Sequence, residues 1–167
     1  IEPGMAFGTG THATTRGCLE FLEQVAESLQ GRKYSALDVG TGAGILAIAL
    51  VKLGATRVWA IDNDPVALQV ARENLNLNGV ADKIQLSARS LPAIRKRFAV
   101  VVANLTAETI LDLAGGLERK VAARGFLILS GILQQKAGAV TRRFTPKFRV
   151  LACRRGKEWA TLMLQQK

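Results

Sequence analysis

The chain has 167 residues, of which 49% are hydrophobic and 22% charged, as is ordinary for one soluble globular domain. Its longest uninterrupted apolar run, residues 45–51, is far shorter than the ~20 residues of a membrane-spanning helix, which argues against a membrane protein. The formal net charge of +10 is lopsided: residues 1–88 hold 7 basic and 9 acidic side chains, and residues 89–167 hold 16 basic and 4 acidic ones. This asymmetry predicts an anionic partner, with RNA or a ribonucleoprotein foremost, although a solvated basic face that aids solubility would also explain it.

Helices and strands are predicted to alternate along most of the chain. Hydrophobic spacing and the punctuating glycines and prolines indicate, in chain order, a helix at 15–29, a strand at 35–39, a helix at 45–53, a strand at 57–61, a helix at 65–78, strands at 83–87 and 98–103, a helix at 106–122, a strand at 125–130, a helix at 134–144 and strands at 148–153 and 159–164. Asp64, directly before Pro65, is predicted to cap the third helix. The alternation predicts an α/β fold with a mostly parallel, doubly wound sheet that has helices on both faces and ends in an antiparallel hairpin.

The most informative motif is the run DVGTGAG at residues 38–44, which joins the first strand to the following helix. Gly40 and Gly42 let the backbone turn sharply and lie against a small ligand at the carboxyl edge of a parallel sheet. A dinucleotide fingerprint would place its third glycine at position 45, but here that glycine is Gly44 and position 45 is Ile. This spacing disfavours an NAD-dependent dehydrogenase and resembles motif I of S-adenosylmethionine (AdoMet) methyltransferases.

Two acidic residues end the first two strands. Asp38 lies beside the glycines, and we expect it to help hold the methionine amino group of the cofactor, although capping of the turn's N–H groups would also explain it. Asp62 ends the second strand 22 residues after Gly40, and a carboxylate at about this spacing accepts hydrogen bonds from both ribose hydroxyls of a nucleoside cofactor. The alternative for Asp62, a residue that merely closes a turn, is the weaker one.

Further candidate positions follow the third and fourth strands. Ser90 is the candidate for contact with the adenine amine, although Arg89 occupies a position where a small residue is common in methyltransferases. Asn104 follows the strand at 98–103, where the methyl group would depart, and it is followed by Leu-Thr-Ala rather than Pro-Pro-aromatic. This argues against the adenine- and glutamine-methylating class and leaves an amide oxygen to orient an amine substrate, whereas the alternative is an Asn that only closes a turn.

The chain starts with a loop rich in Gly and Thr, residues 3–15, which leads into the first helix. We expect this loop to fold over a ligand as a lid, with a frayed terminus as the alternative. His12 is predicted to start the helix or to pack against it rather than to act as a base. Because Cys18 and Cys153 are distant in sequence and His12 is the single histidine, we expect no metal site, reduced thiols and a cytoplasmic location.

Together these segments resemble the catalytic domain of the ribosomal protein L11 methyltransferase family over essentially the whole chain. The resemblance rests on AFGTGTH at residues 6–12 with the two threonines at 14 and 15, DVGTGAGIL at 38–46, IDNDP at 61–65, ANL at 103–105 and EWA at 158–160. It implies the Rossmann-like fold of class I AdoMet-dependent methyltransferases, with seven strands. The family also has a small N-terminal substrate-recognition domain. Because the chain starts at Ile1 without Met, we expect residues 1–167 to be the catalytic domain of a longer protein.

The resemblance also implies an activity and a site. By this resemblance, AdoMet is the cofactor, Asn104 is the candidate catalytic residue, and the contacts to AdoMet or its surroundings come from Thr15, Gly40, Asp62 and Asn104, with Phe7 and Thr9 in the loop that closes over its methionine end. The expected reaction is methylation of lysine side chains and the N-terminal amine of a large-subunit ribosomal protein. The basic second half would meet the ribosome or ribosomal RNA. Two alternatives stay open, namely an RNA methyltransferase and an AdoMet-binding fragment that is inactive without its missing domain.

Overall fold

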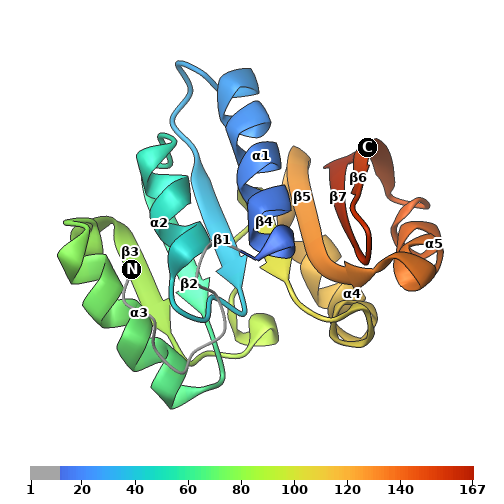
Figure 1. Ribbon diagram of the computed structural model, residues 1–167. Coiled ribbons are helices and arrows are strands. Elements are labelled where there is room, and N and C mark those ends of the chain that lie inside the picture. Colours follow the sequence, from blue (N-terminus) through green and yellow to red (C-terminus); the bar gives the residue numbers. More distant parts are fainter. Residues whose placement is uncertain (1–11) are drawn as a thin grey trace.

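A seven-stranded sheet organises the computed structural model of the chain, which describes residues 12–167 (Figure 1). The strands lie in the order β3-β2-β1-β4-β5-β7-β6. Their bounds are β1 (Ser35–Val39), β2 (Arg57–Ile61), β3 (Ile84–Ser87), β4 (Phe98–Asn104), β5 (Val121–Leu133), β6 (Phe148–Arg155) and β7 (Trp159–Gln166). The helices are α1 (Ala13–Ser28), α2 (Ile45–Lys52), α3 (Pro65–Leu77), α4 (Ala107–Lys120) and α5 (Gln134–Phe144), with short 3-10 turns η1 (Ala81–Lys83) and η2 (Leu91–Ala93).

The pairing of the strands confirms the predicted topology. Neighbouring strands from β3 to β5 run parallel, whereas β7 runs antiparallel to both β5 and β6. The strand order reverses beside β1, which pairs with β2 on one side and with β4 on the other. In open α/β sheets a ligand binds at such a reversal, in the crevice outside the carboxyl ends of the strands.

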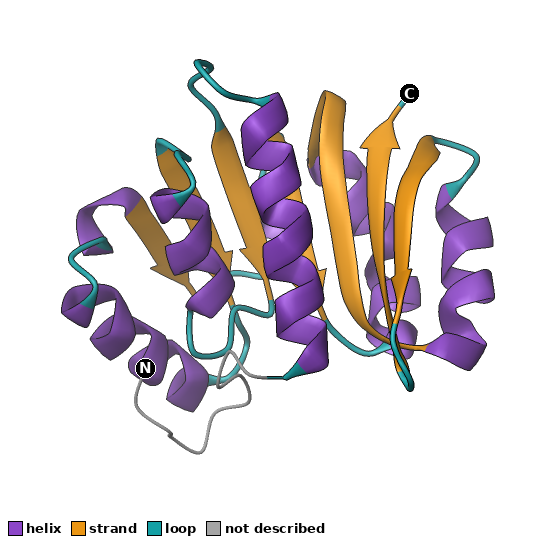
Figure 2. Cartoon of the chain, turned by 45° about the horizontal axis from the view of Figure 1, so that its top comes forward, coloured by secondary structure: helices purple, strands orange, loops and turns teal. Residues whose placement is uncertain are grey.

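Two apolar cores cover the two faces of the sheet. Helices α1, α2 and α3 pack on one face and α4 and α5 on the other, as Figure 2 shows for the two layers of helices. Strand β4 contributes to both cores, because Val100 and Val102 face the first and Val101 and Ala103 the second, and all four are buried. This confirms that its continuous apolar run belongs to a strand that is covered on both faces.

Most predicted boundaries hold within a few residues, and one strand is longer than predicted. Strand β5 was expected at 125–130 but spans Val121–Leu133, because its first residue pairs with Phe98 and its last with Trp159. Positive φ angles at Arg124 (58°) and Gly131 (80°) accompany register shifts along this strand. The predicted cap of α3 is confirmed, since Asp64 Oδ1 accepts a hydrogen bond from Val66 N at 2.8 Å. Within residues 12–167 no helix is long and apolar enough to span a bilayer.

Candidate functional site

A cavity of about 1150 Å³ lies at the carboxyl ends of the parallel strands, beside the point where the strand order reverses. In Figure 1 this is the end of the sheet to which the arrowhead of β1 points and at which α1 begins. Its lining comes from the start of α1, the turn after β1, the ends of β2 and β4 and the segment before η2, and it includes Thr15, Gly40, Gly42, Asp62, Arg89, Ser90, Asn104 and Trp159. Candidate site residues from five separate segments therefore meet at one cavity.

The turn after β1 has a backbone that only glycines adopt readily. Gly40, Gly42 and Gly44 have φ angles of 72°, 53° and 82°. A Cβ at Gly40 would lie 2.5 Å from Leu105 Cδ2, and a Cβ at Gly44 would lie 2.9 Å from Leu75 Cδ1. Gly44 is thus explained by close packing of α3. Gly40 is likewise required by its close approach to Leu105, and both Gly40 and Gly42 line the cavity.

Asp62 braces this turn from the end of β2. Its Oδ2 accepts a hydrogen bond from Gly42 N at 2.8 Å, and its Oδ1 accepts one from Asp64 N at 3.0 Å. The carboxylate is held between two backbone segments while it lines the cavity. Each carboxylate oxygen has a second lone pair, so the side chain can still accept hydrogen bonds from a vicinal diol.

Asp38 is buried beneath the turn and does not line the cavity. The Thr41 hydroxyl donates to Asp38 Oδ2 at 2.6 Å, and among residues 12–167 Asp38 Oδ1 has no hydrogen-bond partner. Burial raises the pKa of Asp38 to about 7, with the nearby Asp62 charge adding to the effect and the Thr41 hydroxyl and the Ala47 amide opposing it. An unpaired buried acceptor beside a ligand cavity is suited to a donor that arrives with the ligand, but the ligand role of Asp38 stays a prediction.

Asn104 ends β4 and lies beside Thr15 in the wall of the cavity. Asn104 Nδ2 is 3.5 Å from Thr15 Oγ1, to which it donates, and both residues line the cavity. With the amide nitrogen turned to Thr15, the amide oxygen is left as an acceptor for another group. The structure therefore brings the predicted catalytic residue and a predicted contact from α1 together.

Sequence reasoning missed the hydroxyl pair that positions the start of α1. Ser130 Oγ donates to the Thr14 carbonyl at 3.0 Å and lies 2.8 Å from Thr161 Oγ1, and all three residues are buried. Gly17 allows this approach, because a Cβ there would lie 2.3 Å from Thr161 Oγ1. Ser130 is 116 residues from Thr14 and 31 residues from Thr161, so no local pattern in the sequence predicts these contacts.

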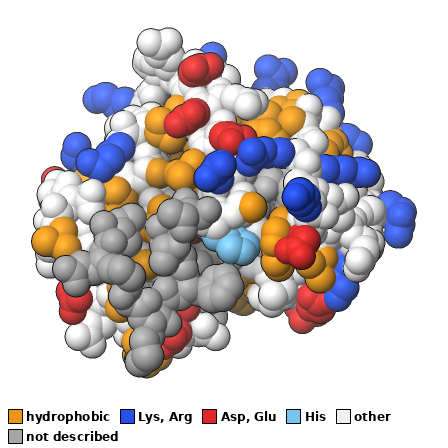
Figure 3. Space-filling view, in the orientation of Figure 1, with side chains coloured by type: hydrophobic (Ala, Val, Ile, Leu, Met, Phe, Trp, Pro, Cys, Tyr) orange, Lys and Arg blue, Asp and Glu red, His pale blue; other side chains and the backbone are white. Residues whose placement is uncertain are grey.

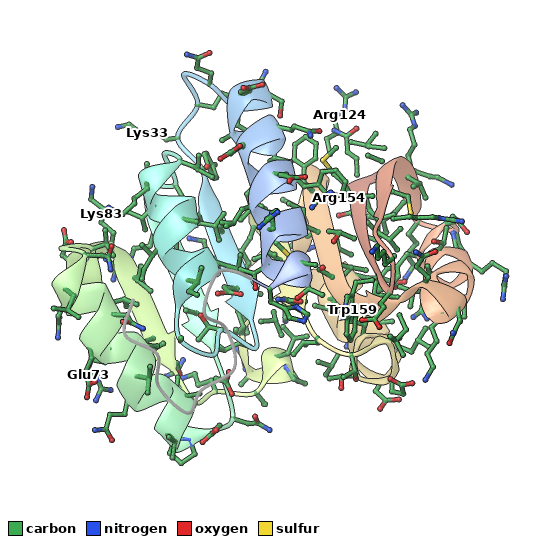
Figure 4. The ribbon with its side chains drawn as sticks, in the orientation of Figure 1. Lys33, Glu73, Lys83, Arg124, Arg154 and Trp159 are labelled. Carbon is green, nitrogen blue, oxygen red and sulfur yellow. The ribbon has the colours of Figure 1, made fainter. Side chains whose placement is uncertain are left out.

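His12 begins α1, as its position in the sequence predicts. Its Nδ1 accepts from Thr14 N at 3.4 Å as the helix N-cap, and its ring meets Trp159 edge-on with 5.5 Å between centroids. Trp159 lies at the start of β7, close to the start of α1 (Figure 4). Arg89 and Ser90 also line the cavity, so the adenine contact stays a prediction there, whereas Phe7 and Thr9 lie outside the described residues.

Comparison with known proteins places the whole chain with one family. The family described as ribosomal protein L11 methyltransferase (PrmA) matches residues 1–167. The ribosomal protein L11 methyltransferase of Geobacter sulfurreducens is 50% identical over 164 residues, which are 98% of this chain and 52% of that protein. The one from Geobacter metallireducens is 49% identical over 166 residues, which are 99% of this chain and 53% of that protein. The chain thus spans about half the length of these curated relatives.

Solved structures agree with the fold. A crystal structure of ribosomal protein L11 methylase from Lactobacillus delbrueckii subsp. bulgaricus has a TM-score of 0.86 at 34% identity, covering 100% of this chain and 84% of that one. The N-methyltransferase NodS from Bradyrhizobium japonicum, solved with S-adenosyl-L-homocysteine, has a TM-score of 0.74 at 15% identity, covering 96% of this chain and 91% of that one. At that identity NodS supports the class I methyltransferase fold alone.

Proposed function

Because the chain belongs to the ribosomal protein L11 methyltransferase family over residues 1–167, we propose that it is the catalytic domain of an AdoMet-dependent protein N-methyltransferase. Its substrate would be a large-subunit ribosomal protein, methylated on lysine side chains and the N-terminal amine. The observation that carries this proposal is the meeting of Gly40, Asp62 and Asn104 at one cavity. We also propose a cytoplasmic location and an accompanying substrate-recognition domain in the complete protein.

The described residues fit AdoMet. The glycine backbone at positions 40 and 42 would lie along the ligand, and Asp62 would accept hydrogen bonds from the ribose hydroxyls. Asp38, which is buried beneath the turn with its Oδ1 unpaired, would help to hold the ammonium group directly or through water. When bound, AdoMet supplies a methyl group on a positively charged sulfur, which is already a strong methyl donor. The chain's own task is then to align an amine with that methyl group rather than to activate the donor.

Asn104 would carry that alignment. Its amide oxygen can accept an N–H from the incoming amine, while Thr15 holds its amide nitrogen. A lysine ammonium, with an ordinary pKa of about 10.4, must lose a proton before it can react. Desolvation in the cavity lowers the pKa of such an ammonium. Because His12 caps a helix and both Asp62 and Asp64 accept backbone N–H groups, we propose that water carries the proton away.

The location of the cavity favours a protein substrate over RNA. The cations of residues 89–167 lie mainly at the opposite edge of the sheet, as described below, so a polyanion held there would not enter the cavity. Methyl transfer from tritium-labelled AdoMet to ribosomal particles, followed by separation of protein from RNA, tests the proposal. We expect label in one large-subunit protein. Label in RNA would reject the protein substrate, and absence of AdoMet binding by calorimetry would reject the cofactor.

A further inference from the structure

Most cations of the second half of the chain gather at the sheet edge opposite the cavity. Helices α4 and α5 and strand β7 run antiparallel to β4 and β5. Their C-terminal ends therefore lie beside the N-terminal ends of β4, β5 and β6. This basic edge is made of ten exposed residues, Arg95, Lys96, Arg97, Arg119, Arg124, Arg142, Arg143, Lys147, Arg149 and Lys167. Figure 3 shows Lys and Arg side chains at the upper right, and in Figure 4 Arg124 lies at the far end of the sheet from Trp159.

The last turn of α4 ties the segments of the basic edge together. Buried Glu118 accepts hydrogen bonds from Arg143, at the end of α5, and from Lys147, just before β6, the latter at 2.7 Å. Although burial raises the pKa of Glu118, these two cations hold it below its ordinary value. Two residues on, buried Lys120 donates to the carbonyl of Ile94, directly before Arg95. The last turn of α4 therefore holds Arg143, Lys147 and the segment before Arg95 close to one another.

Two cations of the basic edge, one from α4 and one from α5, lie close together. A Cβ at Gly115 would lie 3.4 Å from Arg119 Nη1 and 3.9 Å from Arg143 Nη2, so guanidinium groups from α4 and α5 share one spot. Glu118 balances one of these charges, but Arg119, Arg143 and Lys147 together exceed a single carboxylate, and the surplus positive charge favours binding of a further anion. Favourable interaction with helix C-termini accounts for the cations in the last turns of α4 and α5, but not for the loop at 95–97 or for Arg124, Arg149 and Lys167.

The chemistry of the basic edge suits a phosphate backbone. Of the four acidic residues in the second half, Glu118 alone lies at this edge, and it is buried and paired. From the first half, exposed Glu23 and Glu27 lie in the later turns of α1, and these two are far outnumbered by the ten cations. Of the large apolar side chains that the described residues expose, namely Val66, Leu77, Leu111, Leu133 and Leu151, none is aromatic. An acidic peptide normally needs apolar anchors, whereas phosphates need only cations spread over a surface. The lack of stacking groups also favours backbone contacts over base contacts.

We propose that the basic edge binds the phosphate backbone of folded RNA and so docks the protein with its cavity facing away from that RNA. The choice of RNA as the polyanion rests on the proposed function, because an enzyme that methylates a ribosomal protein works where ribosomal RNA is at hand. Here RNA is a docking partner and not the methyl acceptor. Binding is expected to be independent of sequence and to weaken steeply with salt.

The test compares two triple variants that remove equal charge. The edge variant carries Arg95→Gln, Arg97→Gln and Arg119→Gln, and the control carries Arg72→Gln, Arg155→Gln and Lys157→Gln, all at exposed positions. Fluorescence anisotropy with a labelled RNA hairpin of about 20 base pairs gives the affinity at several salt concentrations. We expect the edge variant to lose about tenfold or more in affinity with a shallower salt dependence, and the control to change about twofold.

Three results would overturn the proposal. These are equal losses in both variants, absence of hairpin binding by the 167-residue chain at about 0.1 M salt, and poly-glutamate that competes as well as RNA, which would indicate an acidic protein partner instead. Circular dichroism of each variant checks that the fold is intact. Since the assay needs no AdoMet, a chain that binds RNA through this edge but fails to bind AdoMet would reject the proposed activity and leave the docking surface standing.

Discussion

The carboxylate of Asp62 accepts a hydrogen bond from the amide of Gly42, with 2.8 Å between Oδ2 and the nitrogen. This contact ties the end of β2 to the glycine turn that follows β1. The residue expected to hold a ribose also maintains the shape of the backbone on which the rest of the cofactor would lie. The shape of the turn and the expected contact with the ligand therefore depend on the same side chain.

Replacement of Asp62 should impair both roles. In Asp62→Ala the amides of Gly42 and Asp64 lose their acceptor, and each hydrogen bond to a charged group contributes about 1.5–3 kcal/mol. We expect the Kd for AdoMet to rise about tenfold or more in calorimetry, together with a lower Tm. Asp62→Asn keeps one acceptor oxygen and should fall between Asp62→Ala and wild type. An unchanged Kd in Asp62→Ala would show that this carboxylate does not hold the ligand.

Gly131 should accept a side chain only at a large cost in stability. It has a φ of 80°, and a Cβ there would lie 2.4 Å from the carbonyl oxygen of Leu105, which is backbone and cannot turn aside. Gly54 is the matched control, since its φ is 103° and no described atom lies within 4 Å of its Cβ position. Urea unfolding should give a loss of about 1–2 kcal/mol for Gly54→Ala and about 3 kcal/mol or more for Gly131→Ala. Equal losses would mean that backbone strain alone, rather than the contact with Leu105, limits position 131.

Asn104→Ala should separate turnover from folding. The side chain is partly exposed, and within residues 12–167 its hydrogen bond is the long one to Thr15, so the free energy of unfolding should change by about 1 kcal/mol or less. If the amide orients the amine, kcat should fall about 100-fold while the Kd for AdoMet changes little. Thr15→Val removes the hydroxyl that accepts from the Asn104 amide but leaves the amide in place, so kcat should fall about tenfold or less. A wild-type rate in Asn104→Ala with the ribosomal protein substrate would end the assigned role.

Much of the fold could be predicted because the residues that start and end its helices and strands are recognisable from the local sequence. Strands β1 and β2 and helix α5 have the predicted bounds. Helix α3 starts as predicted and ends one residue before the predicted end, since Asp64-Pro65 and Asn78-Gly79 mark its two ends. The predicted range for β5 is too short. Its outer residues belong to the sheet because they pair with Phe98 and Trp159, and this pairing produces no alternation of apolar and polar residues in the sequence. The structure thus adds the strand ends that depend on pairing with residues distant in sequence.

The candidate site was predictable for a geometric reason. Carboxyl ends of parallel strands share one edge, so Gly40, Asp62 and Asn104 had to meet once the strand order was known. The pair of Ser130 and Thr161 could not be predicted, because it depends on the antiparallel register of β7 against β5. The charge asymmetry likewise predicts an anionic partner, but it does not predict that the cations lie at the edge of the sheet opposite the cavity.

The stability of the protein should depend on pH through Asp38. Burial raises the pKa of this carboxyl from 3.8 to about 7 in the folded state, so folding favours its protonated form. Its contribution to stability is therefore complete below the unfolded pKa and declines as pH rises through the folded pKa. The free energy of unfolding should fall between about pH 4 and pH 7, by up to about 4 kcal/mol if the whole shift is realised. Glu118, whose pKa is lowered, acts in the opposite sense and at the acid end of this range.

Asp38→Asn isolates this effect, because the amide keeps an acceptor for the Thr41 hydroxyl but does not titrate. Urea unfolding at a series of pH values should give a flatter profile for Asp38→Asn than for wild type between about pH 4.5 and 7. A cationic ligand that pairs with Asp38 favours the ionised carboxyl, so wild type should also bind AdoMet more tightly as pH rises through about 7, whereas Asp38→Asn should not. Parallel stability profiles for the two proteins would show that Asp38 is ionised in the fold. Parallel binding profiles with divergent stability profiles would limit Asp38 to supporting the turn.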